Sequence, residues 1–589
     1  MKTGLPRSLQ EWLHWFEIGD GARWLRAAAL VAATLLLTWL VYYKQFRSPL
    51  TETTLAQAVT GRQLAQGDGF TTLVNYPQSF AWAQERDAAG KFTNTAHPLP
   101  ELHQPPLYPT AIAATLLLSH LLPQRIIANP TAADYALLAL NIALLWCAAM
   151  QTYFLAKKFF GAPAGVIALS ALLLSAPIWN ATMALNGTPL TMVLLLALFQ
   201  LLARADIVEQ HSLPALALAG LLAALLFLGD HAALVIFPIV CVWLYLHERN
   251  PRAPLVFAAI FIIAVSPWLA RNTALTGNPL AFTWQNITLK SGDPAADPAT
   301  TRATFSTAAP ALDINKLGNK TLTSLQTGIG AHLWSGGGIF LTAFFIAGFL
   351  YRFRDARTNR LRWLATATLL TLAFAQALLD SGEGERPVWT CAAPLIVIFG
   401  AGFFTVLVTS NETLAARPAR AGLAALVLLA AQAVPLARNL AAPRNANVQS
   451  YNFPPYLPAL FAGMGKEMAR GRETPLAWMA DVPAGAAWYS GQRVWAQPAV
   501  LEDFAQATKR QPVRALVLTP ATLARPAASL LKPTATATRA PRPTWPEVYR
   551  ALLADGSARL PPDFPLTLPK RVLDDFYVLI DPLTPATGK

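Results

Sequence analysis

The sequence predicts a multi-pass α-helical membrane protein that carries a small α/β domain at its C-terminal end. Of the 589 residues, 54% are hydrophobic and 13% are charged, and the mean hydropathy is +0.37. This composition is too apolar for a soluble protein of that length. Apolar runs of about 20 residues, the length that crosses a bilayer as a helix, recur as far as residue 438. Beyond residue 440 the pattern changes to short strand-like and helix-like runs.

The apolar runs place eleven transmembrane helices, near residues 25–43, 133–156, 163–183, 188–204, 213–228, 232–247, 254–270, 338–351, 363–379, 388–408 and 421–438. The first is predicted to be a retained anchor, because the polar stretch before it is longer than that of a signal peptide.

The charges of the loops orient these helices. With a cytoplasmic N-terminus, the short outer loops hold only Arg386, as the positive-inside rule requires. The cytoplasmic side collects Lys2, Arg7, Arg23, Arg26, Lys157, Lys158, Arg204, Arg249, Arg252, Arg352, Arg354, Arg357, Arg360, Arg362, Arg417 and Arg420. The net charge of +14 is therefore a topology signal, and no nucleic-acid partner is expected.

One apolar run, residues 107–122, is predicted not to cross the membrane. Its 16 residues cover about 24 Å as a helix, which is short of the hydrocarbon core of about 30 Å. Counting it as a span would also move Lys157 and Lys158 to the outer side. We expect a helix that begins after Pro105 and Pro106 and lies in the outer interface.

Three segments then meet on the outer side: residues 44–132, residues 271–337 and the tail. We divide the chain into a membrane domain, 1–440, and an outer α/β domain, 441–589. In the tail, "RALVLTP" and "FYVLIDP" predict strands, and "YLPALFAGMGKEMAR" and "WPEVYRALLADG" predict helices. The stretch "PTATATRAPRPTWP" is typical of a flexible linker.

Four stretches in order carry a family resemblance: "TETTLAQAVTGRQLAQGDGFTT", "HQPPLYPTAIAATLLL", "SPWLARNTALTGNPLAF" and "ERPVWTCAAPLIVI". Together they resemble the bacterial glycosyltransferase family 39 of the GT-C superfamily, relatives of protein O-mannosyltransferases and of the lipid A aminoarabinose transferase. The resemblance implies transfer of a hexose or pentose from a polyprenyl-phosphate carrier to a lipid, glycan or protein acceptor. It implies a bacterial cytoplasmic membrane, with the reaction on its outer face. No bound cofactor is expected.

In that family an Asp, usually followed by Glu, opens the first outer loop and supplies the catalytic or acceptor-orienting carboxylate. Here Thr51 stands at the Asp position and Glu52 at the Glu position. An acceptor hydroxyl that attacks an anomeric carbon must lose a proton, so one carboxylate is needed. Glu52 is the first candidate and Asp68 the next. The alternative is helix-cap chemistry, because Thr followed by Glu is also typical of a helix start.

The leaving phosphate needs a cation at the outer interface, and the planar fork of Arg suits phosphate oxygens. Arg386 is the first candidate, with pairing to Glu383 or Glu385 as its alternative. Arg271 is the second, with anchoring of a helix end as its alternative.

His103, Gln104 and Tyr108 continue the family-like stretch and are candidates for the substrate cavity. A divalent cation held by Glu52, Asp68, His97 and His103 stays an open alternative, although their spacing does not demand one, and we assign no metal site.

Two other functions remain open. One is a relative without transferase activity that acts as a surface scaffold, which Thr51 at the Asp position favours. The other is a transporter of polyprenyl lipids, which the near absence of charged residues inside the predicted spans disfavours.

A reporter enzyme fused after residue 440 should be active only outside the cytoplasm, because the charge asymmetry orients all eleven spans together. A matched fusion after residue 20 should report from the cytoplasm. A cytoplasmic signal from the first fusion would contradict the span count, and residues 107–122 would be the first segment to reassign.

Overall fold

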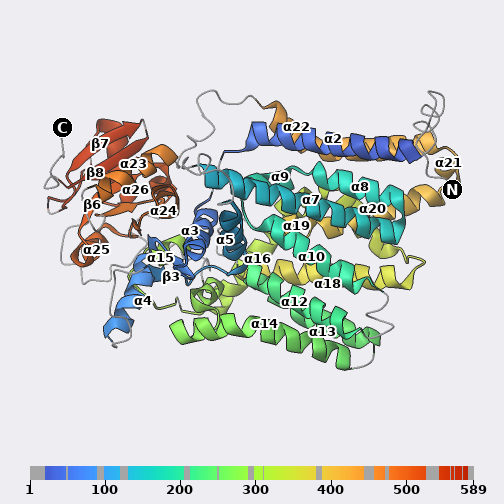
Figure 1. Cartoon of the computed structure of the whole chain (residues 1–589), viewed down its shortest axis with the longest axis horizontal. Helices are drawn as coiled ribbons and strands as arrows, with labels where there is room; N and C mark the ends of the chain where they lie inside the picture. Colours follow the sequence, from blue (N-terminus) through green and yellow to red (C-terminus); the bar gives the residue numbers. More distant parts are fainter. Residues whose placement is uncertain are drawn as a thin grey trace.

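The computed structural model describes residues 20–47, 51–88, 98–119, 131–204, 212–248, 251–288, 298–309, 311–379, 388–442, 457–470, 476–524, 543–557, 559–562, 564–573 and 575–581. It shows a bundle of helices with an α/β domain at one end (Figure 1). We call this end of the bundle the domain end and the opposite end the far end.

A helix lies at each of the eleven predicted positions. The helices are α2 (Asp20–Gln45), α7 (Ala132–Phe160), α8 (Ala162–Leu173) with α9 (Ala176–Met183), α10 (Thr188–Leu202), α12 (Leu213–Gly229), α13 (Ile236–Glu248), α14 (Arg252–Thr276), α17 (Leu333–Ala347), α18 (Ala356–Leu379), α20 (Ala393–Ser410) and α22 (Pro418–Ala441). Among the described residues, six helices are by themselves long and apolar enough to cross a membrane. The number is seven if α8 and α9, which are bent by 53° at a short break, form one span.

Glycines set how closely these helices pack. A Cβ atom on Gly400 of α20 would lie 2.3 Å from the carbonyl oxygen of Leu341 on α17. A Cβ on Gly220 of α12 would lie 2.5 Å from the carbonyl oxygen of Phe257 on α14. Small residues at such crossings let backbones approach, as is common between membrane helices.

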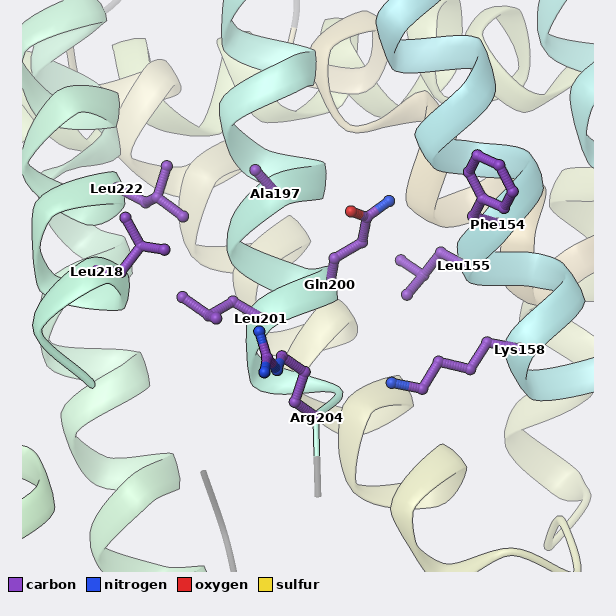
Figure 2. Close-up of a pocket in the computed structure, with 9 residues that line it drawn as sticks. All are labelled: Phe154, Leu155, Lys158, Ala197, Gln200, Leu201, Arg204, Leu218 and Leu222. Carbon is purple, nitrogen blue, oxygen red and sulfur yellow. The ribbon is translucent and has the colours of Figure 1, made fainter. Parts of the chain in front are cut away.

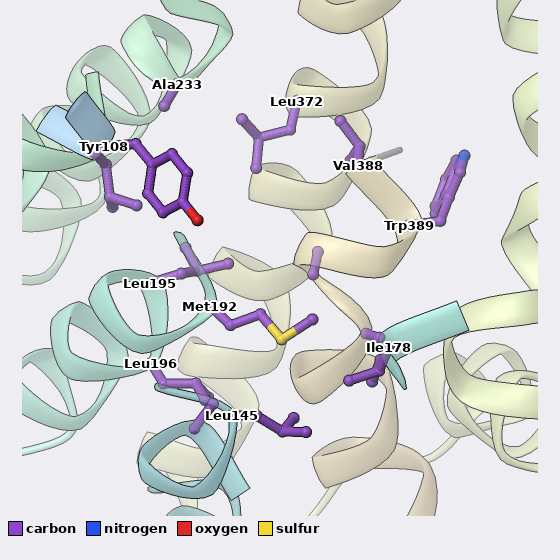
Figure 3. Close-up of a cluster of buried hydrophobic side chains, with 14 of the residues drawn as sticks. Tyr108, Leu145, Ile178, Met192, Leu195, Leu196, Ala233, Leu372, Val388 and Trp389 are labelled. Atoms are coloured by element: carbon purple, nitrogen blue, oxygen red, sulfur yellow. The ribbon is translucent and has the colours of Figure 1, made fainter. Parts of the chain in front are cut away.

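The centre of the bundle is a cluster of buried apolar side chains, among them Leu145, Met192, Leu195 and Leu372 (Figure 3). Tyr108 reaches into this cluster from the first long loop. The apolar core therefore joins the spans to the segment that covers the domain end.

That first long loop is ordered over most of its length. It contains α3 (Glu52–Gln66), β1 (Thr71–Thr72), β2 (Val74–Asn75), α4 (Pro77–Ala88), β3 (Leu99–Pro100) and α5 (Leu107–Ser119). The 13 residues of α5 cover about 20 Å, too little to span a bilayer. Figure 1 shows α5 at the domain end, running across the direction of the spans. The helix is therefore placed as predicted, and its contact with the membrane interface stays a prediction.

The second long loop contains η2 (Ala281–Ile287), α15 (Pro298–Arg302) and α16 (Ile314–Thr327). It also lies at the domain end. The backbone N–H of Phe282 donates to the carbonyl oxygen of Leu102, so the two loops are in direct contact.

The C-terminal domain is built on a six-stranded sheet with the order β2-β5-β4-β6-β8-β7. The tail supplies β4 (Ala477–Ala480), β5 (Val494–Ala496), β6 (Val513–Leu518), β7 (Leu568–Leu573) and β8 (Phe576–Ile580). It also supplies α23 (Pro458–Ala469), α24 (Pro483–Ser490), α25 (Phe504–Arg510) and α26 (Trp545–Asp555). The two predicted strands and two predicted helices of the tail are thus confirmed.

The sixth strand comes from the first long loop. Val74 and Asn75 of β2 pair in parallel with Val494 and Trp495 of β5. The sheet therefore extends beyond the division proposed at residue 440, which stays a prediction. Most of the predicted linker, up to residue 542, lies outside the described residues.

Replacing Gly61 by Ala should destabilise the protein by about 1–3 kcal/mol, the usual cost of an overpacked contact. A Cβ at this position would lie 2.6 Å from Cγ2 of Ile112 and 2.8 Å from the carbonyl oxygen of Pro109, so α3 and α5 would be forced apart. Thermal unfolding of the purified full-length protein measures the effect. Gly318→Ala is the control, because nothing lies within 4 Å of its Cβ and Ala favours the helix. Equal melting of both variants would contradict the close α3–α5 packing.

Candidate functional site

Helix α3 lies between the membrane helices and the C-terminal domain (Figure 1). Thr51 is its N-cap, with an extended backbone, and its hydroxyl accepts a hydrogen bond of 3.3 Å from the N–H of Thr54. The helix ends at Gly67, whose φ of 90° is a left-handed conformation that suits glycine. The cap chemistry considered for Thr51 is therefore confirmed.

Glu52 is the first residue of α3 and reaches the C-terminal domain. Its two carboxylate oxygens accept hydrogen bonds from the backbone N–H groups of Ala484, at 2.8 Å, and Gly485, at 3.1 Å. These N–H groups belong to the first turn of α24, where backbone donors lack partners inside the helix and the helix dipole favours a negative charge. Glu52 thus binds the N-terminus of α24, and a chemical role for it stays a prediction.

A second contact joins α24 to the membrane helices through Asp134, in the first turn of α7. The Asp134 carboxylate is fully buried and accepts hydrogen bonds from the indole Nε1 of Trp488, at 2.9 Å, and the hydroxyl of Tyr489, at 3.0 Å. Two donors on one carboxylate satisfy a charge that would be costly to bury alone.

Arg62 of α3 completes this group. Its guanidinium donates to the carbonyl oxygen of Trp488 and lies 3.7 Å from the centre of the Trp488 ring. Burial lowers the pKa of Arg62 to about 10, while Asp134 and Tyr489 act to raise it, so Arg62 stays charged at neutral pH. Neither Arg62 nor Asp134 was singled out from the sequence. The sequence does contain one feature that points to Asp134, because it is a lone acidic residue at the outer start of the predicted span 133–156.

Asp68, the second candidate for the base, lies just beyond the opposite end of α3. It is exposed, and one of its oxygens accepts a hydrogen bond of 3.3 Å from Gln63. The 15 residues of α3 span about 22 Å, so Glu52 and Asp68 do not meet at one reacting centre.

Arg271 lies at the domain end of α14, beside Phe70. Its guanidinium donates to the carbonyl oxygens of Phe70, at 3.1 Å, and Glu101, at 3.2 Å, and packs against the ring of Trp268. These contacts fit the anchoring role that was the alternative for Arg271. A phosphate contact by Arg271 stays a prediction.

Glu101 and His103 form a buried polar group beside Arg271 and Arg302. Burial raises the pKa of Glu101, against the opposing effects of the His103 N–H, Arg302 and Arg271. Burial and the charge of Arg302 hold the pKa of His103 well below its usual value, so its imidazole is neutral. The imidazole Nε2 lies 3.2 Å from the hydroxyl of Ser79.

The three residues expected in a substrate cavity are buried in contacts within the protein. His103 stacks on the ring of Phe282, and Gln104 accepts a hydrogen bond of 3.1 Å from Gln57. The Tyr108 hydroxyl lies 2.5 Å from the carbonyl oxygen of Leu185. These contacts position the loop on the bundle, and contact with substrate stays a prediction.

Arg386, the first candidate for the phosphate, lies outside the described residues, as does His97. Over the part of the chain that the structure describes, no group of three or more His, Cys, Asp or Glu side chains is placed to hold a metal ion.

Tyr489→Phe should lower the stability of the docked domain by about 1.5–3 kcal/mol, because the Asp134 carboxylate would lose one of its two donors. Tyr549→Phe is a matched control in the same domain, since that hydroxyl donates to the neutral carbonyl oxygen of Asp575 and its loss should cost about 1 kcal/mol. Limited proteolysis and thermal unfolding of the full-length protein would compare them. A larger effect of Tyr549→Phe would show that Asp134 does not depend on its contact with the domain.

No family model and no curated protein sequence matches the chain. Among solved structures, ArnT from Cupriavidus metallidurans bound to undecaprenyl phosphate superposes with a TM-score of 0.54 at 13% identity, over 96% of this chain and 99% of ArnT. The oligosaccharyltransferase of Archaeoglobus fulgidus, in a complex with Zn and sulfate, superposes with a TM-score of 0.51 at 13% identity, over 82% of this chain and 67% of that protein. The chain therefore shares the fold of these two proteins.

Proposed function

We propose that this protein is a membrane glycosyltransferase that moves a sugar from a polyprenyl-phosphate carrier to an acceptor at the domain end of the bundle. The observation that carries the proposal is the likeness in fold to ArnT, over nearly the whole of both chains, in a structure that holds undecaprenyl phosphate. The two long loops and the C-terminal domain gather over the same end, where a lipid-linked sugar and a water-soluble acceptor would meet.

In the reaction, an acceptor hydroxyl oxygen bonds to the anomeric carbon of the sugar, and the bond from that carbon to the phosphate oxygen breaks. The polyprenyl phosphate leaves with the electron pair, and this newly formed anion takes up the hydroxyl proton, directly or through water, as the new bond forms. Arg386 keeps its proposed role at the leaving phosphate, which rests on the sequence alone.

We assign Glu52 to the acceptor side as an ionised carboxylate that orients the hydroxyl. The N–H groups of Ala484 and Gly485 stabilise its charged form and fix its position. A carboxylate held in this way has a fixed direction and forms strong hydrogen bonds to a hydroxyl. The assignment therefore favours orientation of the acceptor over general-base catalysis for Glu52.

The scaffold alternative has one observation in its favour. Glu52 and Asp134 both bind groups of α24, so each carboxylate has a structural task in the absence of any substrate. The two functions differ in one respect: a scaffold needs only the contact of Glu52 with α24, whereas a transferase needs its negative charge.

Glu52→Gln should lower transfer about 10- to 100-fold, because the acceptor would lose a hydrogen bond to a charged group, worth about 1.5–3 kcal/mol. Glu52→Asp should retain more transfer than Glu52→Gln, since it keeps the charge. The measurement is sugar transfer from labelled polyprenyl-phosphate donors in membranes, together with mass spectrometry of surface glycans with and without the protein.

Trp488→Phe is the control, because it weakens the contact of α24 with Asp134 and leaves Glu52 unchanged. Transfer by this variant should stay close to that of the unmodified protein. If both variants lose transfer equally, Glu52 acts only by holding α24. If the unmodified protein transfers no sugar from any such donor, the scaffold alternative replaces the proposed function.

A further inference from the structure

A pocket of about 350 Å³ lies between α9, α17 and α22. Leu428 and Asn439, which line it on α22, are about 16 Å apart along the helix axis. A hydrocarbon core of about 30 Å gives each leaflet about 15 Å of depth. Because α22 ends at the domain end of the bundle (Figure 1), the pocket reaches from the middle of the bundle to that end and is about as deep as one leaflet.

Each of the three helices is irregular where it lines the pocket. A bend of 53° at residues 174–175 separates α9 from α8, and Gly338 interrupts α17 with a φ of 72°. Pro435 lies inside α22 and removes one backbone hydrogen bond. Irregular backbone at membrane depth is tolerated where it is buried in protein or lines a cavity. The three irregularities therefore indicate that the pocket is a built feature of the spans.

Two hydrogen bonds hold the walls of the pocket in place. The Ser175 hydroxyl donates to the carbonyl oxygen of Gly336, at 3.3 Å, and joins the start of α9 to α17. The Gln432 amide donates to the carbonyl oxygen of Ala171, at 3.3 Å, and joins α22 to α8. A Cβ on Gly338 would lie 1.5 Å from Oε1 of Gln432, so glycine is needed to leave room for this side chain. The walls are therefore fixed by contacts within the protein.

The inner part of the pocket is apolar and opens toward the side of the bundle. Ile339 and Phe340 of α17 line it and are 68% and 50% exposed. On a bundle that crosses a membrane, such side chains contact lipid chains. A lipid chain can therefore enter the pocket sideways from the bilayer.

The outer end of the pocket is polar but uncharged. Asn180 and Asn439, both exposed, line this end together with Trp334, and Trp is enriched at the membrane–water interface. Among the described residues, no charged side chain lines this pocket, whereas Lys158 and Arg204 line the pocket between α7, α10 and α12 (Figure 2). A phosphate group is bound best by cations, so an uncharged headgroup suits the outer end.

We propose that this pocket binds one acyl chain of an uncharged, hydroxyl-bearing lipid of the diacylglycerol class, and that this lipid is the acceptor of the proposed transfer. The acyl chain lies along Leu341 and Leu428. Asn180 and Asn439 bind the hydroxyl-bearing headgroup, since side-chain amides both donate and accept hydrogen bonds. The assignment of this lipid as the acceptor rests on the proposed function.

The contacts of α9 place the headgroup on the side of the proposed site. The Asn141 amide of α7 donates to the carbonyl oxygen of Asn186, at 3.1 Å, shortly beyond the end of α9. Asn141 is about 10 Å along α7 from Asp134, which binds the C-terminal domain. In the reaction, the lipid hydroxyl oxygen bonds to the anomeric carbon, the bond from that carbon to the phosphate oxygen breaks, and the leaving phosphate takes up the hydroxyl proton.

The binding test uses a diacylglycerol that carries a photoreactive diazirine in one acyl chain, added to the full-length protein in detergent. After irradiation, mass spectrometry of peptides should locate the label on pocket residues of α17 and α22. Ala431→Trp fills the pocket and should lower this labelling about 10-fold, which corresponds to the lost burial of about two methylene groups. Val434→Trp is the matched control and should leave the labelling unchanged, because Val434 is an exposed residue of the same helix outside the pocket.

A second variant tests the headgroup contact without filling the pocket. Asn439→Leu should lower the labelling about 5-fold, the worth of one hydrogen bond. Because Asn439 is exposed, this variant should fold like the unmodified protein.

The transfer test uses a labelled polyprenyl-phosphate sugar as donor and diacylglycerol as acceptor. Ala431→Trp should raise the KM for diacylglycerol about 10-fold and leave the KM for the donor unchanged. Transfer to a soluble acceptor but not to diacylglycerol would overturn the lipid as acceptor and leave the proposed function intact. Labelling of the pocket without transfer from any donor would overturn the proposed function, and the assigned acceptor with it, while the lipid site would remain.

Three further results would overturn the lipid site itself. Equal labelling of Ala431→Trp and Val434→Trp would place the lipid outside the pocket. Equal labelling by a photoreactive phosphatidylglycerol would mean that the pocket does not select an uncharged headgroup. Competition by polyprenyl phosphate, with weaker donor binding in Ala431→Trp, would assign the pocket to the prenyl chain of the donor.

Discussion

The contact of α24 with α3 and α7 fixes the position of the C-terminal domain on the membrane helices. Glu52 binds the N-terminus of α24, Asp134 binds Trp488 and Tyr489 near its C-terminus, and Arg62 lies against the Trp488 ring. Because Asp134 is buried, removing either of its two donors would leave part of its charge without a partner, at a typical cost of about 1.5–3 kcal/mol. The charges therefore make the docked arrangement specific, while the apolar core supplies most of its stability.

This contact also makes the first long loop part of both halves of the protein. The loop supplies β2 to the sheet of the C-terminal domain and supplies Tyr108 to the core of the bundle. Its α3 and α5 pack so closely at Gly61 that a side chain has no room there. A displacement of the domain would pull on β2 and α3 together, so the shape of the domain end depends on the loop as a rigid unit.

The helices and strands that could be predicted from the sequence are those marked by a local pattern of apolar residues. Apolar length located all eleven helix positions, and alternation located β6 and β8, because each pattern is local. The pairing of β2 with β5 joins residues more than 400 positions apart, and no local pattern reports such a contact. Asp134 and Arg62 were missed for the same reason, since their donors and neighbours come from the tail.

Thr51, as the N-cap of α3, determines what the carboxylate of Glu52 can contact. An acidic residue at an N-cap turns its side chain back to the first N–H groups of its own helix. Thr51 takes that task here, so the carboxylate stands one residue later, on the first turn of α3, and extends to a different helix. The Glu52 carboxylate at the start of the loop therefore holds α3 against α24. Any acceptor that Glu52 orients must then bind at the junction of the membrane helices and the domain, where the N–H groups of Ala484 and Gly485 hold the carboxylate in place.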